Sequence, residues 1–201
     1  MPGRDEIVRS LTGAWRLFLD RSDAMRFFDV SVDGFWRSFG AIVLILPAYI
    51  LVVLSDRARI LTDAVSDEGF DASSFFANRG VWLALNWVAL PILLALVARP
   101  LRVGRTYAGY IVARNWCAVL TVAPFGLIAL LYLVGLLGNE IASVISLVII
   151  VVVIRFDYLI ARRALGADIG LAVAVVIADL AIGLAIAVVI DTIFVYGPLL
   201  P

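Results

Sequence analysis

Histidine and lysine are absent from this chain of 201 residues, and cysteine occurs once, as Cys117. Histidine is the commonest metal ligand and titrates near neutral pH, so its absence removes the usual basis of hydrolytic and metal-dependent mechanisms. One cysteine builds neither a disulfide framework nor a thiolate metal site within a single chain. We therefore expect no metal and no cofactor in this protein.

The motifs of the common enzyme classes are missing as well. The sequence has no glycine-rich phosphate loop, no paired catalytic carboxylates at a fixed spacing and no serine–histidine arrangement. Its 16 basic residues, all arginine, balance 16 acidic residues, so no net charge indicates a nucleic-acid partner or an acidic substrate. The sequence therefore predicts a non-enzymatic protein with no nucleic-acid partner.

Apolar residues are what the sequence has in excess. They make up 64% of the chain, and the mean hydropathy is +1.07, whereas soluble domains are about 45–50% apolar. A soluble fold could not bury this excess, so we expect an integral membrane protein. The first 34 residues carry many charges and no apolar signal region, so they do not form a cleavable signal peptide.

The apolar residues form unbroken runs, which favours helices over a β-barrel. A helix needs about 20 apolar residues to cross a bilayer. The predicted fold class is therefore all-α, a bundle of five transmembrane helices, with residues 1–34 as a cytoplasmic segment and residues 35–201 as the membrane domain. The predicted spans cover about 38–54, 80–98, 106–137, 141–161 and 169–190.

The third predicted span contains Pro124. Splitting the span at this proline would leave a second piece of about 13 residues, which is too short to cross a bilayer. Membrane helices tolerate proline kinks, so a single kinked or tilted helix is expected. Tight turns follow it, and spans three, four and five should be sequential antiparallel neighbours.

Arginine residues gather in alternate connections between the spans. Twelve lie in the N-terminal segment, in the connection after the second span and at the end of the fourth, and three lie on the opposite side in residues 55–79. The positive-inside rule then places the N-terminus in the cytoplasm and the C-terminus outside. Because the arginine-only basic composition indicates a GC-rich bacterial genome, the predicted location is the inner membrane of a bacterium.

The N-terminal segment shows helical periodicity. Its apolar residues recur at helical spacing, namely Ile7, Val8, Leu11, Trp15, Phe18 and Leu19. This pattern predicts an amphipathic helix that lies in the membrane interface. The favoured interpretation is a stabilising helix packed beneath the bundle, and the alternative is a membrane-surface sensor or a docking helix.

Polar residues inside the predicted spans are candidate functional residues, because membrane-embedded polar groups are costly. Asp179 and Asn86 both fall near the bilayer midplane by the helical rise per residue. We expect them to face each other inside the bundle, where Asp179 either belongs to a proton or substrate path or is protonated and only structural.

Four further polar residues could join them in one cluster. Arg114 and Asn115 are either buried or, the favoured interpretation, form an interfacial anchor beside Trp116. Arg155 and Asp157 lie near the cytoplasmic end of the fourth span, where snorkelling or mutual pairing would also explain them. The candidate polar site is thus the set of residues Asn86, Arg114, Asn115, Arg155, Asp157 and Asp179.

Small residues recur every four positions in the fifth span, at Gly170, Ala174 and Ala178. A small-xxx-small face of this kind allows close packing of membrane helices. The packing partner is either another span of the same chain, a second copy of the chain or another membrane protein.

Two stretches resemble members of the Yip1-like group of small membrane proteins. One is Gly34-Phe35-Trp36-Arg37-Ser38-Phe39, ahead of a span containing Pro47, and the other is residues 107–116, which read YAGYIVARNW. The resemblance extends to the five-span layout and implies a non-enzymatic membrane protein with no catalytic residues to carry over. In eukaryotes such proteins bind small GTPases, but the shorter and less acidic N-terminal segment here departs from them.

Two functions follow as expectations. The first is a scaffold or accessory protein of the membrane that binds other membrane proteins or lipids. The alternative is a small transporter or channel that uses Asp179 and Asn86, although no inverted repeat or broken helix pair supports a typical transporter. A membrane enzyme ranks third, because the polar cluster lacks a nucleophile or a metal set.

Overall fold

The computed structural model describes residues 2–63 and 71–196, and its regular structure there is helical. Short 3-10 turns, Ala24–Phe27 and Phe39–Ala41, separate the first helices. The α-helices are α1 Arg4–Phe18, α2 Val32–Ser38, α3 Ile42–Asp63, α4 Ala72–Val97, α5 Tyr107–Leu133, α6 Asn139–Ala164 and α7 Ile169–Tyr196. Five helical stretches in the described residues are long and apolar enough to cross a membrane, which confirms the predicted all-α bundle.

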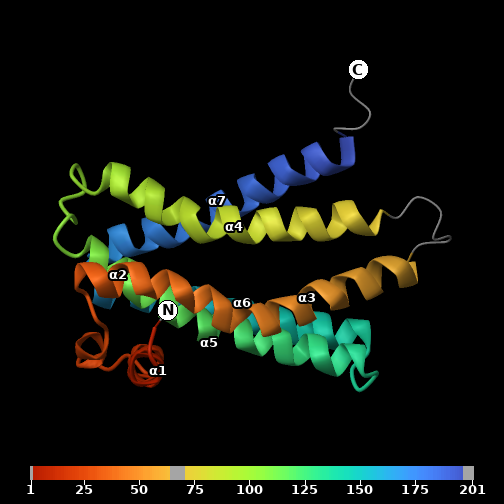
Figure 1. The fold of residues 1–201 in the computed structure, drawn as a ribbon, viewed down its shortest axis with the longest axis horizontal. Coiled ribbons are helices and arrows are strands. Elements are labelled where there is room, and N and C mark those ends of the chain that lie inside the picture. The colour runs from red at the N-terminus through yellow and green to blue at the C-terminus, as the bar shows by residue number, and fades with distance from the viewer. Residues whose placement is uncertain (1, 64–70, 197–201) are drawn as a thin grey trace.

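The five stretches form two groups (Figure 1). Helices α3, α5 and α6 pack side by side, with α5 in the middle, while α4 packs mainly against α7. Helix α7 also contacts α6 and so joins the two groups. Helix α4 makes few contacts with α3 and α5. The two groups are therefore not closely packed against each other along α4.

The first two spans are longer than predicted. The first runs from Val32 to Thr62 and the second begins at Ala72. Charged residues at positions 56 and 79 suggested a long outer loop, but Asp56 and Arg79 form an ion pair of 3.4 Å between α3 and α4. Since each charge has a partner inside the bundle, both helices continue through these positions.

The third span is one uninterrupted helix through Pro124, as predicted. The tight turns after it also agree with the prediction, because α5 contacts α6 and α6 contacts α7. At the second turn Gly166 has a φ of +67°, a left-handed conformation that favours glycine. Asp168 then accepts a hydrogen bond from the backbone N–H of Leu171 at 2.7 Å and caps α7.

Helices α3 and α5 approach each other closely at Gly126. A Cβ atom at this position would lie 2.6 Å from the Cβ and 2.7 Å from the Cα of Ala48. Two small residues therefore allow the backbones to meet, as is common in membrane helix packing.

Helix α1 contacts α5 and α6, and its buried residues are three small ones and Leu17. Ser10, Gly13 and Ala14 are buried there, whereas Trp15 of the predicted apolar face is exposed. Of the predicted apolar residues, Ile7, Leu11 and Phe18 pack against the core, whereas Val8 and Leu19 are exposed like Trp15. The location of α1 in the membrane interface stays a prediction.

Ion pairs hold the N-terminal segment in place. Arg37 donates to Glu6 at 2.8 Å and to Asp29 at 2.7 Å, and Arg163 of α6 donates to Asp20 at 2.8 Å. Hydrogen bonds from Arg16 and Arg26 lower the pKa of Asp23 to about 2. The segment is thus joined to the bundle by polar contacts as well as by apolar packing.

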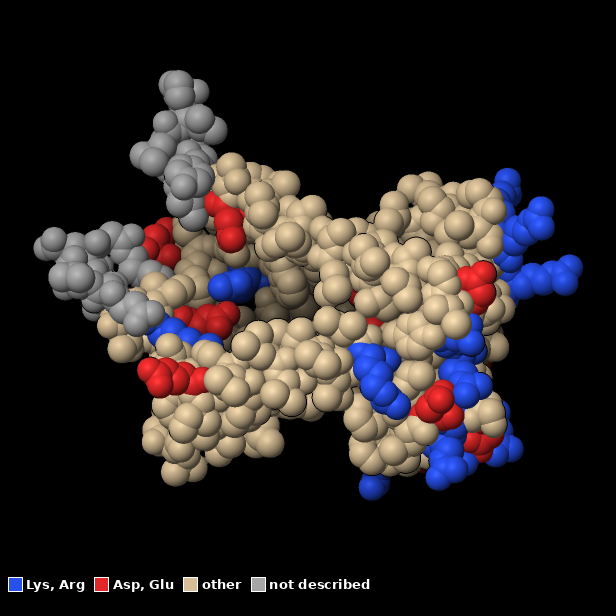
Figure 2. All heavy atoms as spheres, turned by 180° about the vertical axis from the view of Figure 1, so that it is seen from behind, with Lys and Arg blue, Asp and Glu red and all other residues tan. Residues whose placement is uncertain are grey.

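Figure 2 shows how the charged side chains are distributed. Arginine residues gather at the end of the molecule that carries α1 and α2, and carboxylates are more prominent at the opposite end. A hollow between the two groups of helices at this opposite end contains both signs of charge.

Candidate functional site

A polar cavity of about 170 Å³ lies between the two groups of helices. We call it the central cavity. Its walls are mainly apolar, with residues such as Ile45 and Val122. The polar and aromatic residues that line it are Tyr49 of α3, Trp82, Asn86 and Trp87 of α4, Arg114 and Thr121 of α5, Asp157 of α6 and Asp179 of α7.

All five spanning helices contribute to the central cavity, and its polar residues lie well inside their helices. Asp179 is ten residues after the start of α7, and Asn86 is fourteen after the start of α4. At about 1.5 Å per residue, these side chains lie deep in the bundle. Polar groups at such a depth face a protein interior or a water-filled cavity rather than lipid.

Arg114 and Asp179 form an ion pair across the cavity. One guanidinium nitrogen of Arg114 lies 3.0 Å from Oδ1 and 3.4 Å from Oδ2 of Asp179. The side chains are 14% and 28% exposed, respectively. The pair compensates both charges in a region where a single charge would be costly.

Asp157 is the second carboxylate of the central cavity. Within the described residues its carboxylate has neither a hydrogen bond nor an ion pair, although it interacts electrostatically with Asp179 and Arg114. With all three groups ionised, two negative charges face one positive charge. In that state the cavity would hold one net negative charge, which a proton or a small cation would neutralise.

Asn86 faces the same space from α4. A Cβ atom at Gly183 of α7 would lie 3.1 Å from Nδ2 of Asn86, so the absence of a side chain at Gly183 lets the amide approach α7. Asp179 and Asn86 share the central cavity as expected, but the ion-pair partner of Asp179 is Arg114.

Asn115 lies outside this cavity. It is fully buried, and its Nδ2 donates to Oγ of Ser38 at 3.0 Å, which links α5 to α2. The favoured interpretation of Arg114 and Asn115 as an interfacial anchor is thus wrong, because one faces the central cavity and the other a helix–helix contact.

Arg155 also lies elsewhere. Arg155 and Asp157 are two residues apart, so they project from opposite sides of α6. Arg155 is exposed and contacts the carbonyl of Phe18 in α1 at 3.4 Å, while Asp157 lines the cavity. Four of the six candidate residues therefore share one cavity, and Arg155 and Asn115 do not.

Charged side chains gather toward the far ends of α3, α4 and α7, the end of the molecule at which Figure 2 shows a hollow that contains both signs of charge. Asp56 and Arg79 pair there, and Asn78 donates to Asp191 of α7 at 2.9 Å. Nearer the cavity, the hydroxyl of Tyr49 donates to the carbonyl of Arg79 at 2.8 Å. We call this region the outer cleft.

Tyr49 and Trp82 form an aromatic pair at the central cavity. The rings of Tyr49 and Trp82 stack with centroids 6.4 Å apart and an interplanar angle of 4°, and both residues line the central cavity. The sequence analysis did not select Tyr49 or the pair of Asp56 with Arg79. Helical spacing was the available signal, because Tyr49 and Asp56 are seven residues apart and therefore share one face of α3.

The central cavity offers few ligands for a metal ion. No group of three or more His, Cys, Asp or Glu residues that could hold a metal occurs in residues 2–63 and 71–196. Two carboxylates and one amide remain as oxygen donors, beside a guanidinium that repels cations. Such a set is suited to a weakly bound monovalent ion or a proton rather than to a tightly held divalent metal.

Comparisons with family models, with curated proteins and with solved structures find no match for this chain. Membership of the Yip1-like group therefore stays a prediction. The functional argument rests on the geometry of the central cavity and the outer cleft.

Proposed function

We propose that this multi-pass membrane protein binds a small monovalent cation or a proton in the central cavity and moves it across the membrane. The main support is one observation: the cavity, deep in the bundle, contains two carboxylates and one guanidinium. The uncompensated carboxylate is a group that a cation or a proton would neutralise.

The route we propose begins in the outer cleft. Its charged side chains provide a hydrated entrance, and the stacked pair of Tyr49 and Trp82 stands between this entrance and Asp157. Movement of this pair would then control access to the cavity. Neither the proposal nor its alternative assigns an enzymatic reaction to the chain.

Flux into proteoliposomes tests the proposal. The purified chain is reconstituted with an internal dye that reports pH or a monovalent cation, and a gradient is imposed across the membrane. We expect flux above that of empty liposomes, and we expect Asp157→Asn to remove it because the carboxylate charge is lost. Glu140→Gln, an exposed carboxylate change on the same helix, is the matched control.

Flux that persists in Asp157→Asn, or no flux above empty liposomes for the native chain, would contradict the proposal. A folded Asp157→Asn variant is confirmed by circular dichroism and by a single symmetric elution peak, so that loss of flux reports on the charge alone.

The second candidate function is that of a scaffold or accessory protein that binds other membrane proteins or lipids. One observation favours it: Gly170 and Ala174, two of the three small residues on the predicted packing face of α7, are exposed. A close-packing face that is open to the surroundings suits a second copy of this chain or another membrane protein.

Cysteine cross-linking tests this second candidate. Native Cys117 is buried, so a disulfide formed in membranes by Ala174→Cys would report contact between two copies through this face. Leu180→Cys, an exposed position about 120° around α7 from Ala174, is the control. A pull-down in mild detergent with mass spectrometry then identifies a different membrane-protein partner at fixed stoichiometry.

A further inference from the structure

Arg155 occupies an unusual position on the outer surface of α6. It lies nine residues before the end of the helix at Ala164, or about 13 Å from that end at 1.5 Å per residue. The residues around it on the same surface, such as Val148 and Val151, are apolar and exposed. A charged group on a lipid-facing surface is costly unless it finds a partner or reaches the headgroups.

The partners of Arg155 within the described residues leave most of its charge uncompensated. Its one hydrogen bond, to the carbonyl of Phe18, is long at 3.4 Å, and it forms no ion pair there. The nearby carboxylate of Asp20 is already bound to Arg163 at 2.8 Å. The guanidinium thus has donors available for an anion that approaches from the lipid side.

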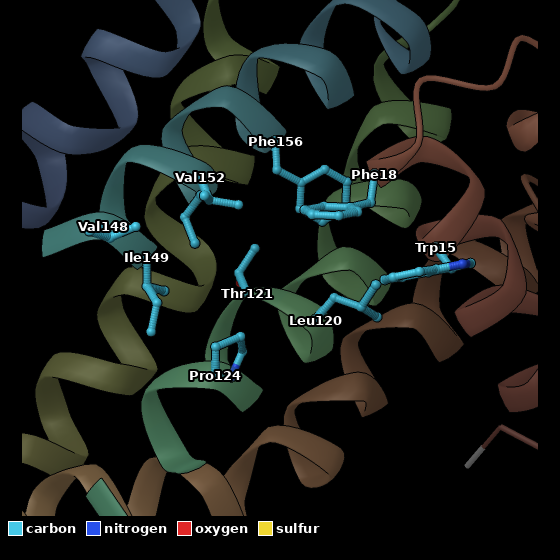
Figure 3. Close-up of a pocket in the computed structure, with 10 residues that line it drawn as sticks. Trp15, Phe18, Leu120, Thr121, Pro124, Val148, Ile149, Val152 and Phe156 are labelled. Atoms are coloured by element: carbon cyan, nitrogen blue, oxygen red, sulfur yellow. The ribbon is translucent and has the colours of Figure 1, made fainter. Parts of the chain in front are cut away.

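An apolar groove of about 200 Å³ has among its walls Phe18, the residue whose carbonyl Arg155 contacts, and we call it the lateral groove (Figure 3). Arg155 itself lies outside this lining and lines a second apolar groove, between α6 and α7. The lateral groove lies between α1, α5 and α6, and its walls include Trp15, Phe18, Leu120, Pro124, Val152 and Phe156. Phe18 packs edge-on against Phe156 with centroids 5.3 Å apart, and Trp15 stacks on Phe18 at 5.4 Å. These contacts close one end of the groove beneath α1.

The polar atoms that line the lateral groove do not indicate a polar ligand. The hydroxyl of Thr121 donates to the carbonyl of Ala118 in its own helix at 3.0 Å. In Figure 3 the indole nitrogen of Trp15 points away from the groove. An apolar chain is therefore the ligand that this surface suits.

The position of Arg155 on α6 relates it to the groove. Residues seven apart share a ridge of a helix, so Arg155 lies on the ridge of Val148, with Val152 and Phe156 on the flank that forms the groove. The guanidinium is also close to Phe18, which lines the groove from α1. Arg155 therefore lies next to one wall of the groove, on the side of α1.

We infer that Arg155 and the lateral groove form a binding site for an anionic phospholipid. The phosphate accepts hydrogen bonds from the guanidinium, which is suited to bidentate phosphate recognition, and one acyl chain lies in the groove between α5 and α6. This site is formed by α1, α5 and α6, and Arg155 lies outside the central cavity, so its failure and the failure of the proposed transport can be told apart.

Quenching of tryptophan fluorescence by brominated lipids tests the site, because Trp15 lines the groove. The full chain is reconstituted in phosphatidylcholine bilayers that contain a small fraction of either phosphatidylglycerol or phosphatidylcholine with brominated acyl chains. The quenching of Trp15 is obtained by subtracting the fluorescence quenching of the Trp15→Phe variant from that of the native chain. We expect brominated phosphatidylglycerol to reach the same quenching of Trp15 at a mole fraction about fivefold lower than that of brominated phosphatidylcholine. One arginine near an anionic headgroup is expected to have an effect of this size.

Variants separate this site from general attraction to basic residues. Arg155→Gln should remove the preference for phosphatidylglycerol over phosphatidylcholine, and Arg155→Lys should keep most of it. Arg99→Gln, which removes an arginine at the same end of the molecule, should leave this preference unchanged. Val152→Phe should reduce the quenching of Trp15, because the larger side chain fills the groove. If Arg155→Gln does not fold, Val152→Phe still tests whether a lipid acyl chain occupies the groove. Excess inorganic phosphate should not displace the lipid.

A preference for phosphatidylglycerol that survives in Arg155→Gln would overturn the inference, as would equal quenching by the two lipids in the native chain. Reversal by inorganic phosphate would also overturn it, because the site would then bind the anion without the acyl chain.

Discussion

The ion pair of Arg114 and Asp179 lies where an unpaired charge costs most. We expect Arg114→Gln and Asp179→Asn each to destabilise the folded chain, because each leaves the partner charge alone inside the bundle. The double variant should lose less stability than the two single variants lose together, with a coupling energy of about 1–3 kcal/mol. Thermal unfolding in detergent measures all three variants, and strictly additive effects would show that the two side chains do not interact.

Asn115 is a residue whose role is structural rather than functional. Its amide donates to Ser38 at 3.0 Å and is fully buried, so Asn115→Ala should leave the Ser38 hydroxyl with one partner fewer at a cost of about 1–2 kcal/mol. Thermal unfolding gives the loss, and the flux measurement should be unchanged in the protein that remains folded. A selective loss of flux without loss of stability would place Asn115 on the transport route instead.

The sequence could predict which residues were unusual but not which would meet. Asp157, Asp179, Asn86 and Arg114 stand out because polar groups are rare in apolar spans. Their pairing depends on the rotation of each helix about its axis, and long apolar runs leave this rotation undetermined. The same reason explains Arg155, whose outward direction is fixed only once α6 packs against α5 and α7.

At the scale of the element, the crossing of α3 and α5 depends on Gly126. We expect Gly126→Ala to destabilise the bundle by about 1–3 kcal/mol, since its added methyl group would overlap Ala48. Gly80→Ala in α4 is the matched control, because a Cβ atom there has no neighbour within 4 Å. Equal thermal stability of the two variants would contradict the close approach of the helices.

The N-terminal segment should respond to acid. Hydrogen bonds from Arg16 and Arg26 hold the pKa of Asp23 at about 2, below its ordinary value of 3.8. A hydrogen bond from Arg163 lowers the pKa of Asp20, and hydrogen bonds from Ser31 lower the pKa of Asp29. A lowered pKa in the folded state stabilises the segment above about pH 4, and this contribution is lost as the pH falls toward 2.

Fluorescence of Trp15, taken as the difference from Trp15→Phe, should therefore change between pH 4 and pH 2 as α1 loosens from the bundle. Asp23→Asn should weaken the segment at neutral pH and reduce the change. A signal that is constant over this range would show that these carboxylates do not fasten the segment.

Helix ends were the element-scale feature that the sequence predicted least well. The first two spans were cut short at Asp56 and Arg79, because charges usually mark the ends of spans. In the structure these charges neutralise each other across two helices, and such pairing depends on tertiary contacts. The number of helices, by contrast, depends only on apolar length, and five was correct.

At the scale of the whole molecule, the charge distribution predicts an orientation. Arginine residues gather at the end that carries α1 and α2 (Figure 2), so the N-terminus should lie in the cytoplasm and the C-terminus outside, in the inner membrane of a bacterium. Fusions of a periplasm-active and a cytoplasm-active reporter after Arg102 and after Asp191 test this orientation. Cytoplasmic activity for the first and periplasmic activity for the second are expected, and the reverse would contradict it.

The proposed route requires that water and small ions reach the middle of the bundle from the outer cleft. The reaction of Asn86→Cys, in a Cys117→Ala background, with a charged thiol reagent that does not cross membranes tests this access most directly. We expect labelling of Asn86→Cys from the outer side, and no labelling of Val148→Cys on the lipid-facing surface. If position 86 does not react from the outer side, the cavity is not reached from the outer cleft and the proposed route is wrong.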